Sequence, residues 1–345
     1  TVGLQAQCFK LTSSGYFKNG GVDVMAYDDI YPEGHQGGVC IIMNGNRIAT
    51  NGDIRLEATP GQWQPVPKQL QRTIGENSID VSLCFPDSSR HMTGFNPMIY
   101  PDLTFNYHVR VEAVGEHIEV SVDLDKPIPE TFAGKVGFNL EFFPGSLFGK
   151  PWIMDGKSGI YPQQPNAPLE ETKSNILQPG DFYTGKGSQA NAEHLIGKGY
   201  SPIVADDIIA KPYAVGKVFT SRPDDKYNKL TIESLTGDLK LYDGRMNHNN
   251  GWFVLRSEIA TGVTKGAVKW IIKPHVEKDW IYKPVIQTSQ VGYHTNQPKE
   301  VVIECDIRDE RKADIELWKI DADEVRMVKK LPAQEWGKFL RYNYL

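Results

Sequence analysis

The sequence predicts an all-β protein made of antiparallel strands in two successive domains. Apolar and polar residues alternate with period two in several runs, which is typical of strands with one buried face. The 345 residues include 32 Gly and 22 Pro, which suit short strands joined by turns. A total of more than about ten strands favours a sandwich of two large antiparallel sheets.

Charge and hydropathy argue against two classes of partner. The 38 basic and 43 acidic residues give a net charge of −5, so nucleic acid is not an expected partner. No apolar run approaches the roughly 18 residues of a membrane-spanning helix.

The cysteines do not define a site. Four widely spaced cysteines fit no zinc pattern, and they are either buried thiols or members of a disulfide: Cys8, Cys40, Cys84 and Cys305.

The first half of the chain gives the clearest strand predictions. Residues 1–79 alternate between Gly-rich turns and short strands such as the apolar run 39–43. Every second residue is apolar in 104–113 and again in 118–124. The Gly-containing turn between these two runs predicts a hairpin with one buried face. Residues 135–142 continue the same pattern.

Residues 143–229 differ in character, because their Pro and Gly prevent long strands. One or two amphipathic helical turns are expected near 189–196. Strands resume at 229–233, 239–242, 252–259 and 267–272. The sequence thus predicts a large β-sandwich domain at 1–283 and a second domain at 284–345. In the second domain we expect strands at 301–306, 313–320 and 325–328.

Two separated segments of the second domain carry a family resemblance. The first reads Ser-Gln-Val-Gly-Tyr at 289–293, then a Pro-containing turn, Lys299 and a strand. The second is Trp-Gly-Lys-Phe-Leu-Arg-Tyr-Asn-Tyr-Leu at 336–345. In this order they resemble the immunoglobulin-like module that precedes the catalytic barrel in many glycoside hydrolase family 9 enzymes, the cellulase-type endoglucanases. Because such a sandwich usually takes roughly 100 residues and about sixty remain here, the resemblance implies a domain that is incomplete at its C-terminus.

The first domain carries a second resemblance. Ala-Gly-Lys-Val-Gly-Phe at 133–138, Phe-Phe-Pro at 142–144, Trp152 and Gly-Ile-Tyr-Pro at 159–162 resemble the large N-terminal sandwich of some bacterial family 9 enzymes. That sandwich belongs to the super-sandwich group that includes galactose mutarotase. The resemblance implies a galactose-mutarotase-like antiparallel super-sandwich, and it concerns the fold rather than an activity.

Together the resemblances imply the non-catalytic N-terminal part of a family 9 enzyme that hydrolyses β-1,4-glucan or a related plant polysaccharide. The expected location is secreted, periplasmic or on the cell surface, and we expect that a leader before Thr1 was removed or left out. The implied partners are a polysaccharide or oligosaccharide and the catalytic barrel of the same polypeptide, without a cofactor.

No catalytic residue is predicted. The family's Asp-Ala-Gly-Asp signature and a barrel of repeated amphipathic helices are both absent from the sequence. The run Asp-Ala-Asp-Glu at 321–324 lacks the glycine and is predicted to be a solvated hairpin turn.

Carbohydrate binding is the favoured role for two polar and aromatic clusters. Sugars expose apolar C–H faces that stack on aromatic rings, while polar neighbours bind the hydroxyls. The predicted sugar-binding residues are Trp152, Asp155, Lys157 and Tyr161 in one irregular segment and Arg245, Asn247, His248 and Trp252 in another. A structural role as core residues is the alternative for the aromatic side chains.

Two further functions stay open. The sandwich is a sugar-active enzyme, such as a mutarotase-like epimerase or a lyase, if a His acid and a carboxylate base meet in one cleft. The available side chains are His91, His108 and His248 and the carboxylates of Glu141, Asp155, Asp206 and Asp207. The eight His show no metal-binding spacing, so no metal site is expected. An adhesion or scaffolding protein would show a flat binding face without a pocket.

Overall fold

The computed structural model describes residues 8–28, 37–57, 60, 66–87, 103–171, 208–246, 251–309, 314–339 and 341–345. The chain divides into two compact units, Thr1–Lys278 and Asp279–Leu345, close to the boundary placed at residue 283. In the described parts all paired strands are antiparallel, which confirms the all-β antiparallel fold class. The helical turns expected near 189–196 lie outside the described residues.

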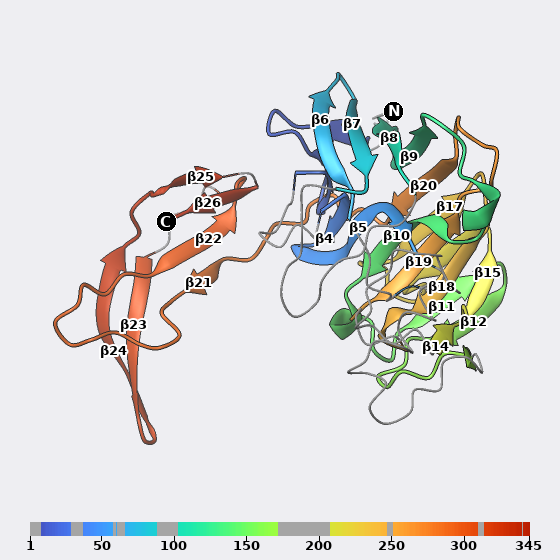
Figure 1. Cartoon of the computed structure of the whole chain (residues 1–345). Helices are drawn as coiled ribbons and strands as arrows, with labels where there is room; N and C mark the ends of the chain where they lie inside the picture. Colours follow the sequence, from blue (N-terminus) through green and yellow to red (C-terminus); the bar gives the residue numbers. More distant parts are fainter. Residues whose placement is uncertain are drawn as a thin grey trace, which may run out of the picture. The chain divides into compact units, whose positions relative to one another are not determined.

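The described residues of the first unit form two nine-stranded sheets, called sheet A and sheet B (Figure 1). Sheet A has the order β1 (Lys10–Leu11), β2 (Phe17–Asn19), β3 (Val22–Ala26), β4 (Val39–Met43), β5 (Asn46–Leu56), β10 (Val136–Phe142), β19 (Phe253–Glu258), β18 (Leu239–Asp243) and β15 (Ala214–Gly216). Sheet B has the order β12 (Lys157–Ile160), β11 (Pro151–Met154), β16 (Val218–Ser221), β17 (Leu230–Ser234), β20 (Val268–Pro274), β9 (His117–Leu124), β8 (Phe105–Val114), β7 (Ser78–Phe85) and β6 (Lys68–Ile74).

Short elements complete the described part of the first unit. They are the strand pair β13 (Leu169–Glu171) and β14 (Ile208–Ala210) and the 3-10 turns η1 (Glu130–Phe132), η2 (Pro144–Ser146) and η4 (Gly244–Met246). In the segment that Pro and Gly were expected to break up, the strands β11, β12 and β16 span four residues each.

Sheets A and B pack face to face around one apolar core. The Phe138 ring of sheet A meets the Trp270 ring of sheet B edge-on, with 5.0 Å between ring centroids. The Trp270 Nε1–H group donates a hydrogen bond to the Ser257 hydroxyl at 3.0 Å, which satisfies the polar end of this buried ring. The unit is therefore a β-sandwich.

The predicted hairpin of 104–113 and 118–124 is confirmed as β8 and β9. Tyr107 faces Leu124 across the ladder and Val109 faces Val122, and all four side chains are buried. The residues between them on β8, such as His108, are exposed or half-buried. One side of this hairpin therefore builds the core, as the alternation predicts.

Sheet A differs from sheet B because β3, β4 and β10 are buried on both faces. On β10, Phe138 and Phe142 belong to the core, whereas Asn139 and Glu141 on the opposite face are also buried. Sheet A thus carries polar side chains at buried positions.

The second unit has a four-stranded sheet and a separate hairpin. The sheet has the order β21 (Val285–Gln287), β22 (Val302–Asp306), β26 (Tyr342–Tyr344) and β25 (Gly337–Phe339), and the hairpin pairs β23 (Asp314–Asp321) with β24 (Glu324–Pro332). Asp321 and Glu324 face each other at the end of the hairpin, so the Asp-Ala-Asp-Glu run is a turn, as predicted.

The structure also shows the state of the cysteines and bears on the membrane question. All four cysteines are thiols: Cys8 is exposed, Cys84 is half-buried, and Cys40 and Cys305 are buried. Among the described residues, no helix has the length and apolar character that a membrane crossing requires.

Candidate functional site

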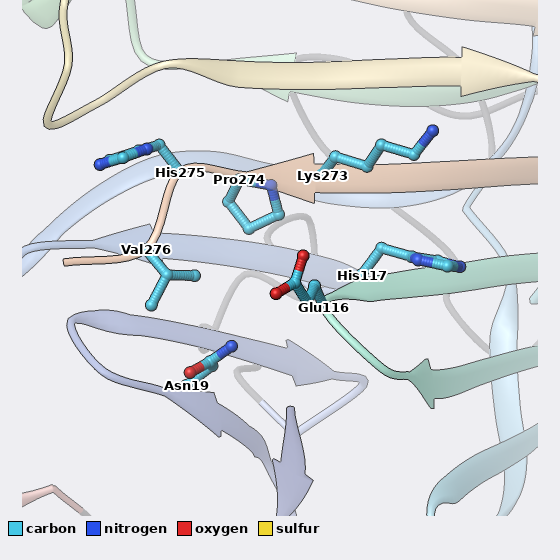
Figure 2. A pocket seen from close by; sticks show the side chains of 7 residues that line it. All are labelled: Asn19, Glu116, His117, Lys273, Pro274, His275 and Val276. Atoms are coloured by element: carbon cyan, nitrogen blue, oxygen red, sulfur yellow. The ribbon is translucent and has the colours of Figure 1, made fainter. Parts of the chain in front are cut away.

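A surface pocket of about 370 Å³ lies in the first unit, where segments far apart in the sequence meet (Figure 2). It is formed by the end of β2, the β8–β9 turn and the end of β20 with the residues after it. The lining residues are Asn19, Glu116, His117, Lys273, Pro274, His275 and Val276. Sheets A and B both contribute to this site.

Backbone hydrogen bonds hold the walls of the pocket together. The Gly21 N–H group donates to the Glu277 carbonyl oxygen at 3.1 Å, which joins the β2–β3 turn to the segment after β20. Gly20 has a φ of 53°, and a Cβ there would lie 2.4 Å from the same carbonyl oxygen. Only glycine allows this backbone approach, because any side chain would collide with the carbonyl group.

The side chains of the pocket divide into two groups (Figure 2). Glu116, Asn19, Pro274 and Val276 converge on its centre, whereas the side chains of His117, Lys273 and His275 extend outward. Glu116 is exposed and makes no hydrogen bond or ion pair within the described part of the chain. The centre therefore combines an available carboxylate, an amide and two apolar surfaces.

Each outward-pointing basic side chain has its own carboxylate partner. Nε2 of His117 lies 3.2 Å from Glu119, and Nε2 of His275 lies 2.9 Å from Glu277. The Lys273 ammonium group lies 2.9 Å from Glu233 on the neighbouring strand β17. Within the described residues, no three His, Cys, Asp or Glu side chains are arranged to hold a metal ion.

The aromatic residues of the first predicted cluster are buried in the core, whereas sugar binding requires exposed rings. Trp152 is 3% exposed and the Tyr161 side chain is fully buried, and both belong to the apolar core. The Tyr161 hydroxyl donates to Ser221 at 2.9 Å, and its ring packs against Phe253. Stacking on a sugar requires an exposed ring face, so the structure corrects the prediction for these two aromatic residues and gives them a structural role.

The polar members of that cluster also bind within the protein. The Asp155 carboxylate accepts hydrogen bonds from the backbone N–H groups of Lys217 at 2.6 Å and Val218 at 3.0 Å. The Lys157 ammonium group donates to the carbonyl oxygen of Tyr213. Both side chains therefore fix the ends of β11 and β12 to neighbouring segments.

The second predicted cluster is only partly described, because Asn247 and His248 lie outside the described residues. The Arg245 guanidinium pairs with the fully buried Asp243 carboxylate at 2.8 Å and donates to the carbonyl oxygen of Pro162. Trp252 is half-buried and packs edge-on against Phe143, with 4.5 Å between ring centroids. Arg245 is thus committed to contacts inside the unit.

The structure brings the two predicted clusters together through Tyr213. Its ring lies 6.3 Å from Trp152 of the first cluster, and its hydroxyl donates to Asp243, the partner of Arg245, at 3.1 Å. Burial raises the pKa of Tyr213 above its ordinary value, and the Asp243 carboxylate adds to this effect. The hydroxyl stays protonated and acts as a donor in this structural network.

A buried polar network on sheet A was missed by the sequence reasoning. Arg256, which is fully buried, donates to the Asn139 side chain at 2.9 Å and lies 3.3 Å from the Glu57 carboxylate. Asn139 donates to the same carboxylate, and Asn51 donates to Glu141, both at 2.5 Å. We call Asn51, Glu57, Asn139, Glu141 and Arg256 the polar network. The available signal was the period-two recurrence of polar residues at 51, 53, 55 and 57.

Burial dominates the electrostatics of the polar network. Loss of hydration raises the pKa of Glu57 to about 6, although Arg256 and the Asn139 hydrogen bond oppose this shift. Nearby, the buried Asp53 carboxylate accepts hydrogen bonds from Tyr107 at 2.7 Å and Tyr27 at 2.8 Å. Burial raises the pKa of Asp53 as well. Carboxylates with raised pKa values are found at active sites and also in structural ion-pair networks.

The residues considered for an enzyme of the mutarotase type are not brought together in the described parts. His108 is exposed on β8, whereas Glu141 lies in the buried network on β10. His91, Asp206 and Asp207 lie outside the described residues.

Comparisons with known proteins give few neighbours. No protein-family model matches the chain, and no curated protein matches it. Among solved structures, a mutant of the heparan sulfate lyase HepC from Pedobacter heparinus aligns with a TM-score of 0.30 and 9% identity, over 95% of this chain and 43% of that one. A second structure of heparan sulfate lyase HepC from Pedobacter heparinus, whose description names no mutation, aligns over the same fractions of the two chains. Its TM-score is 0.28 and its identity is 9%. The chain thus spans less than half the length of these neighbours, and similarity of this size carries no argument about function.

Proposed function

We propose that this chain is a non-catalytic β-rich part of a secreted glycoside hydrolase of family 9, which acts on β-1,4-glucan or a related plant polysaccharide. Its role is to pack against and stabilise the catalytic barrel of the same polypeptide and to bind carbohydrate. A periplasmic or cell-surface location fits the same role.

The observation that carries the proposal is that the two segments that resemble the family 9 module fold into one compact unit. Residues 289–299 and 336–345 belong to one compact unit, Asp279–Leu345. The Tyr293 hydroxyl accepts a hydrogen bond from the Ser289 N–H group at 3.2 Å and donates to the Glu300 carbonyl oxygen, so it ties the first segment together. In the second segment, the Trp336 N–H group donates to the Tyr344 carbonyl oxygen at 2.9 Å. The strand β22, which follows the first segment, pairs with β26 of the second segment, so one sheet joins the two.

The proposal is tested by affinity electrophoresis of residues 1–345 in gels that contain hydroxyethylcellulose, xyloglucan or mannan. We expect slower migration in at least one β-1,4-linked polysaccharide than in a gel without polysaccharide. We also expect no release of reducing ends from these substrates, because the proposal places hydrolysis on the barrel. Unaided cleavage of a cellulosic substrate by this chain would overturn the proposed role.

One observation favours a second candidate, a sugar-active enzyme in its own right. The polar network holds two buried carboxylates, Glu57 and Glu141, and repulsion between their charges contributes to the raised pKa of Glu57. A pair of carboxyl groups is the usual machinery for acid and base catalysis on sugars. Release of reducing ends that the substitution Glu57→Gln abolishes would establish this candidate. The pocket of Figure 2 counts against the third possibility, a scaffold with a flat binding face.

A further inference from the structure

We infer that the pocket of Figure 2 binds one neutral hexopyranose ring of a glycan, held between the Glu116 carboxylate, the Asn19 amide and the apolar surface of Pro274 and Val276. This inference rests on the carbohydrate-related function proposed above. It assigns the binding to a pocket at the turns of the sandwich and not to the clusters around Trp152 and Arg245.

The size and rigidity of the pocket fit a small ring. Its volume of about 370 Å³ lies at the lower end of the roughly 300–1,000 Å³ of small-molecule sites. The Gly21 carbonyl oxygen accepts a hydrogen bond from the Asn44 N–H group at 2.8 Å, and the Gly21 N–H group donates to Glu277. Because these backbone bonds exist without a ligand, little conformational freedom remains to be lost on binding.

The centre of the pocket has the two surfaces that a sugar ring requires. The half-buried Val276 has no hydrogen-bonding side-chain atoms and suits the C–H face of a pyranose, and the buried Pro274 adds to the apolar lining. The Glu116 carboxylate offers two acceptor oxygens to neighbouring hydroxyls, and the Asn19 side chain adds a polar group to the lining. Hydrogen bonds to a charged acceptor are stronger than those between neutral groups.

The charge around the pocket disfavours an anionic ligand. The only ammonium group of the lining, Lys273, already pairs with Glu233, and the imidazoles of His117 and His275 lie beside Glu119 and Glu277. The carboxylate at the centre, Glu116, has no partner in the described residues and repels a sulfate or a uronate. The ligand class is therefore an uncharged sugar.

The test is a proton NMR titration of residues 1–345 with cellobiose as the probe. The C2–H signals of His117 and His275 are assigned with the variants His117→Gln and His275→Gln. We expect both signals to shift in a saturable way, with a dissociation constant on the order of 1 mM. The signal of His294 in the second unit should not move, because this residue does not line the pocket.

Glu116 supplies the decisive variant. Glu116→Ala should weaken cellobiose binding by at least about tenfold, the effect of losing one hydrogen-bonded charged group. The unfolding temperature should stay unchanged, because Glu116 is an exposed turn residue. The matched control is Glu76→Ala, which changes an exposed glutamate in the β6–β7 turn of the same sheet and should leave binding intact.

Three results would overturn the inference. They are signals that stay still with cellobiose, shifts of equal size in Glu116→Ala, and larger shifts with glucuronate or inorganic sulfate than with cellobiose at the same concentration. If these signals stay still while polysaccharide gels retard the chain, only the pocket assignment fails and the proposed function stands. If retardation is also absent, the carbohydrate-binding part of the proposed function fails with it.

Discussion

Trp152 and Gly159 show how a single residue sets the packing at the edge of sheet B. They face each other across β11 and β12, and a Cβ at position 159 would lie 2.2 Å from Cζ2 of Trp152. The substitution Gly159→Ala should therefore displace the buried ring and lower the free energy of unfolding by about 1–3 kcal/mol. Urea denaturation measures this change. Gly145→Ala is the control, because nothing lies within 4 Å of a Cβ there, and equal stability losses in both variants would contradict the packing argument.

Glu57 gives a prediction about pH. Burial raises its pKa in the folded chain to about 6, compared with an ordinary value of 4.5. The folded state therefore keeps the proton at pH values where the unfolded chain releases it. The stability from this protonated group is complete below pH 4.5 and is lost as the pH rises through 6, a change of about 2 kcal/mol.

The variant Glu57→Gln isolates that contribution, because glutamine stays neutral at every pH. We expect the free energy of unfolding of the variant, measured relative to the unchanged chain, to rise by about 2 kcal/mol between pH 4.5 and pH 7. Denaturation curves at several pH values measure the difference. A difference that is constant across this range would show that Glu57 titrates normally in the folded chain.

At the level of elements, β23 and β24 form a hairpin in which most apolar side chains are exposed. Ile320 and Val325 face each other, with 75% and 62% of their surfaces accessible. Replacing both by threonine keeps the β-branched shape and should change the free energy of unfolding by less than about 0.5 kcal/mol. Because exposed apolar strands promote association, self-association should become weaker. Sedimentation velocity at increasing protein concentration measures this effect.

The matched control for that hairpin is the cross-strand pair Val109 and Val122 in β8 and β9, where both side chains are fully buried. Threonine at either position places a hydroxyl in the core and should cost roughly 1–3 kcal/mol. If threonine lowers the free energy of unfolding equally at the exposed and the buried pair, then the apolar side chains of β23 and β24 are covered by another surface in solution.

For the whole molecule, the two units differ in how much apolar surface they bury. The core of the first unit joins both sheets, and its members all lie between Phe9 and Ile272. Among the described residues of the second unit, the buried hydrophobic side chains are Ile303 and Cys305. Stability follows buried apolar area, so the first unit should unfold as an independent cooperative domain.

A fragment of residues 1–278 tests this expectation by calorimetry. It should keep the main thermal transition of the full chain, with a midpoint changed by only a few degrees. In the full chain, residues 279–345 should be cut by protease at a lower temperature than the first unit. A fragment without a cooperative transition would mean that the first unit depends on the second.

Several strands were predictable because their two sides have different surroundings. In β8 and β9 one side is apolar and the other polar, so the period of two in the sequence marked the core side correctly. The β23–β24 turn was predictable for a local reason, since short polar residues favour tight turns. In sheet A the pattern was a poorer guide to burial, because β3, β4 and β10 are buried on both faces, including the polar positions of β10.

The candidate site was beyond the reach of the sequence for a physical reason. Periodicity records the side of a strand to which a residue points, but not what covers that side. Trp152 was therefore indistinguishable from an exposed sugar-binding ring, and Glu57 from a residue on a solvated face. The pocket around Glu116 combines turns that lie far apart in the chain.

The sequence by itself determined the all-β class, the β8–β9 hairpin and the turn at 321–324, because these depend on neighbours along the chain. Only the tertiary structure decided which aromatic rings are buried, which carboxylates share one network and which turns enclose a pocket. Those properties depend on contacts between segments that are distant in sequence, and the packing of sheets A and B brings these segments together.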